Sequence, residues 1–480
     1  SNPGAGYGSF ASLQEKHPEV NTWERHALFY MEYALSHPND WDWFDQEWGQ
    51  IQRAWEWLRA NHALNSLIFL RIFDSFLDRR SLWVDEINWT QDGIRIADQL
   101  GEHRQKGILL NALGITLANI GEVQQSLDCL NEAVDIARQV QDDGLLFDSL
   151  TNLGSSLHRL GNSQQAIDLY NQALEIAEKL GDAYRRANAT ANIALAYSYL
   201  GQIRRSVDLF QESLKLIQPV GNARQEIIIL NNLGIAHQNL GELSQARDVF
   251  EKAVALSRET GRRQYEASAL GNIGLCYYRT GDMQSAIDYY TQQLQIVRET
   301  GDRRGVGNAL RNIGLAYAGM EEIPKAITYY EQSLEIANEI GDVAGQGTTF
   351  GNLGGAYRKL GDRQKALECY LKRLEIAQQI GDVRRQAVGF GGIGNLYLDA
   401  GELEKALYYY QKALSVSREV GDVQAESSWA WNIGLVYEMQ GSIEQAIEYC
   451  SIAVTIDEKL GHVNASRGRV HLEKLRIKLL

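Results

Sequence analysis

Residues 301–340, GDRRGVGNALRNIGLAYAGMEEIPKAITYYEQSLEIANEI, decide the fold, because variants of this stretch recur along most of the chain. Each half places apolar residues every three or four positions, which is typical of an amphipathic helix. Glycine recurs at twenty-residue steps from Gly101 to Gly461, interrupted only by Gln141 and Glu321. A glycine just past an amphipathic segment favours a left-handed helix stop. The series therefore predicts two helices per unit, repeated nine times as a solenoid.

The first hundred residues differ from the rest, since they hold eight of the ten tryptophans. Helical periodicity is present in four segments there: 22–36, 42–61, 64–77 and 82–99. We expect a disordered tail over residues 1–20 and a tryptophan-rich helical cap over 21–100, which includes a degenerate repeat. Nine units then fill 101–460. An amphipathic helix over 461–480 closes the open end, as terminal repeats require.

Composition favours a binding protein over an enzyme. The 480 residues carry a formal charge of −14, which argues against nucleic acid or an anionic membrane as the main partner. No apolar run approaches the roughly 20 residues of a membrane span, and the start lacks a signal-peptide pattern. The four cysteines fall in different repeats, which favours free thiols in a reducing, cytoplasmic compartment. We find no Ser/His/Asp set, metal-ligand spacing or phosphate loop, and expect no metal, cofactor or catalysis.

Small and aromatic residues recur at fixed places in each unit. Gly314 in the first helix and Ala326 in the second let the two helices approach, and Tyr330 fills the gap beside them. Gln293 and Arg373 stand where another small residue is expected, which predicts looser packing at those two places.

These positions resemble the tetratricopeptide repeat (TPR), and the 40-residue length resembles its long-helix subtype, found in kinesin light chains and Leu-Gly-Asn-repeat adaptors. The resemblance implies an all-α, right-handed superhelical solenoid of helix hairpins, whose first helices line a concave, protein- or peptide-binding groove.

The amino-terminal part adds a second resemblance. The segments 24–30 and 47–57 are similar to the region that follows the winged helix in NB-ARC/STAND signalling ATPases, where a repeat-built sensor arm comes next. No GxxxxGK[ST] loop occurs in this chain. The resemblance thus implies a ligand-sensing arm whose NTPase module lies N-terminal in a parent protein. The alternative is a free-standing adaptor of the Leu-Gly-Asn type.

One stripe of the first helices is the candidate binding surface. Asparagine, a mediocre helix former, occupies the same interior position in seven of the nine units. Either these amides bridge adjacent repeats, or they offer donors and acceptors to the main chain of a bound peptide. The residues expected to line the groove are Asn152, Asn188, Asn192, Tyr199, Asn232, Asn239, Asn272, Leu275, Arg279, Arg311, Asn312, Leu315, Asn352, Lys359, Asn395 and Asn432.

The sixth to eighth units add glycines and basic residues to this stripe. The glycines, among them Gly347, Gly351 and Gly391, indicate either a deepened groove or close packing between helices. A basic group on an acidic chain suggests acidic groups on the partner, although solvated surface charge is the alternative. It comprises Arg279, Arg304, Arg311, Arg358 and Lys359.

Overall fold

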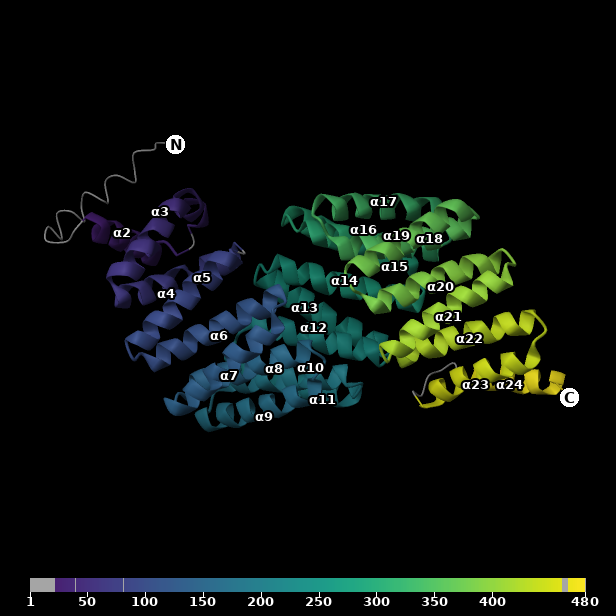
Figure 1. The fold of residues 1–480 in the computed structure, drawn as a ribbon, viewed down its shortest axis with the longest axis horizontal. Coiled ribbons are helices and arrows are strands. Elements are labelled where there is room, and N and C mark those ends of the chain that lie inside the picture. Colours follow the sequence, from purple (N-terminus) through teal and green to yellow (C-terminus); the bar gives the residue numbers. More distant parts are fainter. Residues whose placement is uncertain (1–21, 39, 81, 460–464, 480) are drawn as a thin grey trace. The chain divides into compact units, whose positions relative to one another are not determined.

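The computed structural model describes residues 22–38, 40–80, 82–459 and 465–479. The expected disordered tail over residues 1–20 lies outside these ranges. The chain divides into two compact units, Ser1–Leu240 and Gly241–Leu480, which we describe separately (Figure 1).

The first unit is built from helices alone in its described part. They are α2 (Thr22–Ser36), α3 (Trp41–Asn61), α4 (Ala63–Arg79), α5 (Trp83–Gln99), α6 (His103–Ile120), α7 (Val123–Gln139), α8 (Asp143–Arg159), α9 (Ser163–Leu180), α10 (Ala183–Tyr199), α11 (Ile203–Ile217), the short η1 (Gln218–Val220) and α12 (Ala223–Asn239). From α6 onward, each helix packs against the helix before it and the helix after it within the unit.

The second unit continues the same alternation. Its helices are α13 (Leu243–Glu259), α14 (Arg263–Thr280), α15 (Met283–Glu299), α16 (Arg303–Gly319), α17 (Ile323–Glu339), α18 (Val343–Leu360), α19 (Arg363–Gln379), α20 (Val383–Asp399), α21 (Leu403–Glu419), α22 (Val423–Met439), α23 (Ile443–Lys459) and α24 (Ala465–Leu479). No strand occurs in the described ranges, so the expected all-α class is confirmed. We call the even-numbered helices α6–α22 first helices and the odd-numbered helices α7–α23 second helices.

The turns between these helices use the left-handed backbone region that the glycine series predicts. The described glycines of the series all have positive φ. Gln141 and Glu321, which interrupt the series, keep the same conformation with φ of 55° and 63°. A side chain in this region is strained, so the geometry of the repeat overrides the preference of the single residue.

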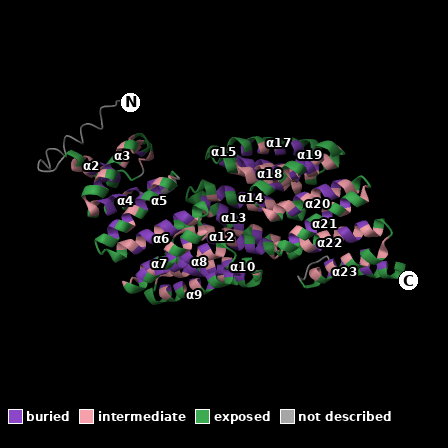
Figure 2. Ribbon diagram, viewed as in Figure 1, coloured by how far each residue is buried: buried purple, intermediate pink, exposed green. Residues whose placement is uncertain are grey.

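Helices α2–α5 share one aromatic core. Trp55 is 2% exposed, and its ring stacks on that of Trp89 with centroids 4.9 Å apart. Phe69 and Phe73 complete the centre, and Leu109 joins it from α6. Buried residues thus continue without a break from these helices to the first repeat (Figure 2). The assignment of residues 21–100 as a cap with a degenerate repeat remains a prediction.

In most helix pairs a small residue faces a ring, as the sequence predicts, whereas Gly114 faces Leu130 and Gly434 faces Cys450. A Cβ placed on Gly314 would lie 2.6 Å from the ring of Tyr330, which is 1% exposed. The expectation of looser packing at Gln293 and Arg373 is wrong. Gln293 reaches over Gly271, where an added Cβ would lie 2.7 Å from Nε2, and Arg373 reaches over Gly351 in the same way. A glycine on the first helix makes room for each long side chain.

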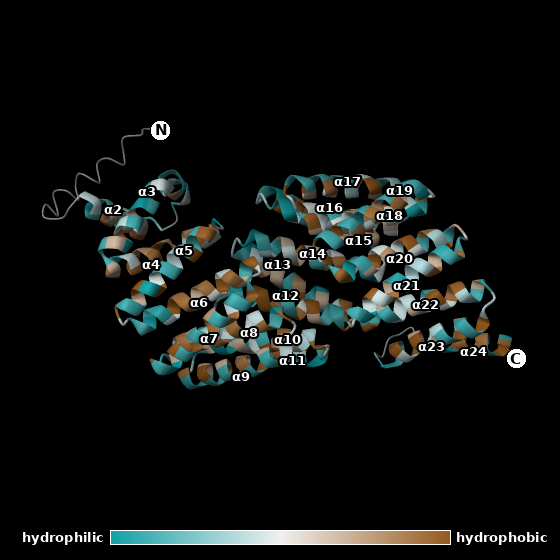
Figure 3. Ribbon diagram, viewed as in Figure 1, coloured by the Kyte–Doolittle hydropathy of each residue, from teal (hydrophilic) through white to brown (hydrophobic). Residues whose placement is uncertain are grey.

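The second unit ends in α24. Leu472 and Leu475 of this helix pack against Ala446 and Cys450 of α23. Polar and apolar residues alternate along the helices of the described chain (Figure 3), and none of these helices is long and apolar enough to cross a membrane. The four cysteines are free thiols, as predicted.

Candidate peptide-binding face

The first helices form the inner side of each unit. Successive first helices touch one another directly, with α6 against α8 and α10 against α12 in the first unit and α18 against both α16 and α20 in the second. No comparable contact joins two successive second helices in the described ranges. Helices on the inner side of a bend approach more closely than those on the outer side. The asparagine stripe lies on these inner helices.

Two of the predicted asparagines bridge neighbouring repeats. Nδ2 of Asn152 donates to Oδ1 of Asn111 at 3.0 Å, and Oδ1 of Asn188 accepts from Nε2 of Gln225 at 3.2 Å. Asn395 has a partner inside its own repeat, since its Oδ1 accepts from the hydroxyl of Tyr410 at 2.5 Å. These three amides have structural roles.

Five other asparagines lack such partners. Their side chains are partly exposed and make no hydrogen bond to any residue that the structure describes. They are Asn192 and Asn232 in the first unit and Asn312, Asn352 and Asn432 in the second. Asn272 is partly exposed at the same helical position. The amides of Asn192 and Asn232 in the first unit, and of Asn312, Asn352 and Asn432 in the second, therefore stand on the inner side without a hydrogen bond to a described residue.

The remaining predicted groove residues divide by exposure. Tyr199 is 73% exposed at the end of α10, and its ring meets His158 edge-on at 4.4 Å. Asn239 is exposed at the end of α12. Leu275 and Leu315 are partly buried, and Leu315 packs onto the core around Tyr330. Of these, Tyr199 is the most accessible to a ligand.

Two of the five residues of the predicted basic group form ion pairs within the protein. Arg358 pairs with Asp399 at 2.6 Å, and Arg304 lies 3.9 Å from Asp342. Nζ of Lys359 donates to the Ala318 carbonyl oxygen at 3.4 Å. Arg279 is exposed at the end of α14. Within this group, only Arg311 is both partly buried and without a salt bridge to a described residue; its Nη2 donates to Oδ1 of Asn308 at 2.6 Å.

Sequence reasoning missed Arg373 as a site residue. This side chain comes from the second helix α19, and its guanidinium group lies over Gly351 of the first helix α18. It is partly buried, makes no salt bridge with any described residue, and its Nε has no hydrogen-bond partner. Burial lowers the pKa of both Arg311 and Arg373, and Arg385 nearby lowers both further. The signal in the sequence was a long, charged side chain, Arg373, at a position where other repeats carry a small residue, together with a glycine, Gly351, on the preceding helix.

Close packing explains several glycines of the sixth to eighth units, although an added Cβ would make only ordinary contacts at Gly307, Gly355 and Gly389. A Cβ on Gly347 would lie 2.9 Å from Ile376, and one on Gly392 would lie 2.7 Å from Tyr370. The indole of Trp429 covers Gly391 in the same way. These contacts favour the packing interpretation over a deepened groove.

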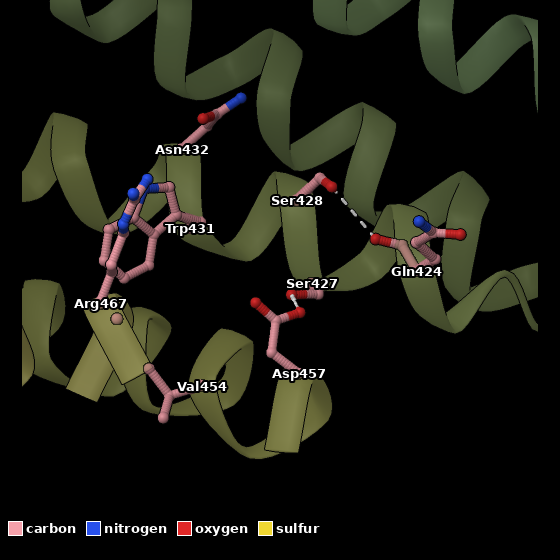
Figure 4. A pocket seen from close by; sticks show the side chains of 9 residues that line it. Gln424, Ser427, Ser428, Trp431, Asn432, Val454, Asp457 and Arg467 are labelled. Carbon is pink, nitrogen blue, oxygen red and sulfur yellow. Dashed lines mark hydrogen bonds between the residues drawn. The ribbon is translucent and has the colours of Figure 1, made fainter. Parts of the chain in front are cut away.

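A pocket of about 410 Å³ adjoins the stripe where α22, α23 and α24 meet (Figure 4). Ser428 and the predicted Asn432 contribute to its wall, together with the indole of Trp431. Oγ of Ser427 donates to Oδ1 of Asp457 at 2.7 Å, and Arg467 of α24 supplies a cation. The pocket therefore has an aromatic wall, a negative charge on Asp457 and a positive charge on Arg467.

The described residues show no constellation typical of catalysis. They contain no group of three His, Cys, Asp or Glu side chains able to hold a metal ion. Nδ1 of His158 lies 3.0 Å from Oγ of Ser163, and burial lowers the pKa of that histidine. No carboxylate of the described residues contacts this His–Ser pair, so the pair lacks the third member of a nucleophilic triad there.

The repeats match a family model described as tetratricopeptide repeat. The matches cover residues 105–179, 145–218, 185–259, 265–339, 305–379, 345–419 and 385–459. A second model with the same description matches residues 231–298. A comparison with curated proteins produced no match.

Several solved structures are similar to the chain. The apo form of RapI is 17% identical, with a TM-score of 0.53, over 71% of this chain and 97% of that chain. A STAND protein with a tetratricopeptide-repeat sensor from Pyrococcus horikoshii is 15% identical, with a TM-score of 0.50, over 98% of this chain and 74% of that chain. Kinesin light chain TPR-like repeats from Podosopora anserina are 20% identical, with a TM-score of 0.37, over 42% of this chain and 98% of that chain. With family matches along most of its length, the chain belongs to the tetratricopeptide-repeat family.

Proposed function

We propose that the inner faces of the first helices bind a protein or peptide, and that the chain is the ligand-sensing arm of a STAND-type signalling ATPase. The observation that carries the binding role is the two sets of partly exposed asparagines, one in each unit, that make no hydrogen bond to a described residue. An amide offers both a donor and an acceptor, so a row at repeat spacing matches the main chain of a peptide.

The sensor role has two supports. The tetratricopeptide-repeat STAND protein from Pyrococcus horikoshii shares its fold with almost all of this chain. The sequence of α2 and α3 also resembles the segment that precedes such sensors. On this proposal the parent protein carries an NTPase module N-terminal to the chain. A parent gene without an upstream phosphate loop would instead support the free-standing adaptor.

The binding role is tested with a triple variant, Asn312→Ala, Asn352→Ala and Asn432→Ala. A ligand captured by the unaltered chain should bind this variant more weakly, by roughly 0.5–1.5 kcal/mol for each lost neutral hydrogen bond. The melting temperature should stay equal or rise, because alanine is the better helix former. A matched control is Asn338→Ala, an exposed asparagine on the second helix α17. Unchanged affinity in the triple variant would remove the asparagine row as a binding surface.

A further inference from the structure

The pocket between α22, α23 and α24 holds two opposite charges that do not neutralise each other. Asp457 of α23 and Arg467 of α24 both line it. They form no ion pair with each other or with another residue that the structure describes. Figure 4 shows the carboxylate turned toward Ser427, apart from the guanidinium group. Space between the two charges is therefore open to a ligand.

The Asp457 carboxylate is held in place by a buried hydroxyl. Ser427 is 4% exposed, and its Oγ donates to Oδ1 of Asp457 at 2.7 Å. Oδ2 of Asp457 has no hydrogen-bond partner among the described residues. A serine hydroxyl carries no positive charge, so the carboxylate, which is partly buried, keeps an uncompensated negative charge. A cationic group entering the pocket would compensate it.

The rest of the pocket is partly apolar. Trp431 and Val454 contribute an indole ring and a methyl group to its wall. Gly468 of α24 allows this close arrangement, because an added Cβ there would lie 2.8 Å from Val454 and 3.5 Å from the Trp431 ring. The volume of about 410 Å³ is in the range of small-molecule sites. The pocket thus combines an apolar wall with one fixed anion and one cation.

We propose that this pocket binds a free α-amino acid with a large apolar side chain. The ammonium group of the ligand donates to Asp457, and its carboxylate accepts from the planar fork of Arg467. The side chain of the ligand packs against Trp431 and Val454. A ligand with only one charge would leave the opposite charge of the pocket uncompensated. This small-molecule site goes beyond the proposed peptide-binding role and does not depend on it.

Four probes separate the groups of the ligand. L-phenylalanine carries both charges and an aromatic ring, phenethylamine lacks the carboxylate, hydrocinnamate lacks the ammonium group, and glycine lacks the side chain. Calorimetric titration at low salt should show that L-phenylalanine binds at least about tenfold more tightly than each of the others. That factor corresponds to the loss of one charge-assisted hydrogen bond or of a buried aromatic ring.

Two variants assign the charges of the ligand to the two walls. Asp457→Asn keeps an oxygen for Ser427, and Arg467→Gln changes an exposed position, so both should fold. Each should bind L-phenylalanine about tenfold more weakly. Asp457→Asn should no longer prefer L-phenylalanine to hydrocinnamate, and Arg467→Gln should no longer prefer it to phenethylamine. The matched control is Arg469→Gln, because Arg469 lies on the same helix but pairs with Glu458 at 2.9 Å. It should leave the binding of all four probes unchanged.

Several results would overturn the amino-acid site. They are no binding of L-phenylalanine at millimolar concentration, equal binding of L-phenylalanine and any of the other three probes, or unchanged affinity in Asp457→Asn or Arg467→Gln. The double variant Asn312→Ala with Asn352→Ala separates this site from the asparagine row, since neither residue lines the pocket. It should bind L-phenylalanine normally, whether or not it loses a peptide ligand. Loss of L-phenylalanine binding in this double variant would contradict the assignment to the pocket.

Discussion

The guanidinium group of Arg373 lies in the space that a side chain on Gly351 would occupy. Gln293 and Gly271 have the same relationship two repeats earlier. In both cases a long polar side chain on the second helix is matched by a missing side chain on the first. The pairing makes room for a long polar side chain between the two helices of one repeat.

This relationship predicts an energetic coupling between the two positions. Gly351→Val should lower the free energy of unfolding by about 1–3 kcal/mol, because the new side chain and Arg373 compete for one space. Adding Arg373→Ala should recover part of that loss, with a coupling of at least about 0.5 kcal/mol in a double-mutant cycle. Gly355→Val is the control, since an added Cβ there meets only the Tyr370 hydroxyl at 3.8 Å. Denaturant unfolding of the unaltered chain, Gly351→Val, Arg373→Ala and the double variant completes the cycle. Additive effects of the two substitutions would show that the side chains at positions 351 and 373 do not compete for one space.

The left-handed turn at Glu321 predicts a stabilising substitution. Glu321→Gly should raise the free energy of unfolding by about 1 kcal/mol, because glycine adopts a positive φ without the clash of a Cβ. The reverse change at the equivalent Gly361, to Glu, should lower it by a similar amount. Thermal or denaturant unfolding of the two variants is the check. A destabilised Glu321→Gly would mean that this side chain stabilises the turn in another way.

Asparagines with and without partners should respond differently to truncation. Asn152→Ala should lower the free energy of unfolding by roughly 0.5–1.5 kcal/mol, because it leaves Oδ1 of Asn111 without its donor. Asn312→Ala should be neutral or slightly stabilising, since it loses no recorded hydrogen bond and gains helix propensity. Urea unfolding of the two single variants compares them directly. Equal losses would show that Asn312 also bridges repeats.

Two buried thiols should be slow to react. Burial raises the pKa of Cys369 and of Cys450 to about 11. At pH 8 each thiol is then about 0.1% thiolate, against about a quarter for an ordinary cysteine of pKa near 8.5. Since thiolate is the reactive form, the rate with a chromogenic disulfide should rise with pH up to about 11. Cys129, which is only partly buried, should react first; rapid modification of all four thiols at pH 8 would contradict this order.

The helices and turns of this protein can be predicted from its sequence alone. The spacing of apolar residues sets each helix, and the glycine at every twentieth position sets each turn. The contact between Gly314 and Tyr330 joins two adjacent helices. All three features depend on residues within one repeat, so the sequence of that repeat is enough to predict them. Because the helices on either side keep the same spacing, Gln141 and Glu321 adopt the left-handed turn conformation that glycine adopts in the other repeats.

Which polar side chains find a hydrogen-bond or ion-pair partner depends on the tertiary structure. Asn152 and Asn312 occupy the same repeat position, yet one meets Asn111 and the other has no recorded partner. Arg358 and Arg311 appear alike in sequence, but only Arg358 reaches a carboxylate, that of Asp399 on the next first helix. Such contacts join residues about one repeat apart and depend on side-chain reach across helices. Periodicity places two positions side by side, whereas a hydrogen bond or ion pair forms only when the particular side chains there are complementary.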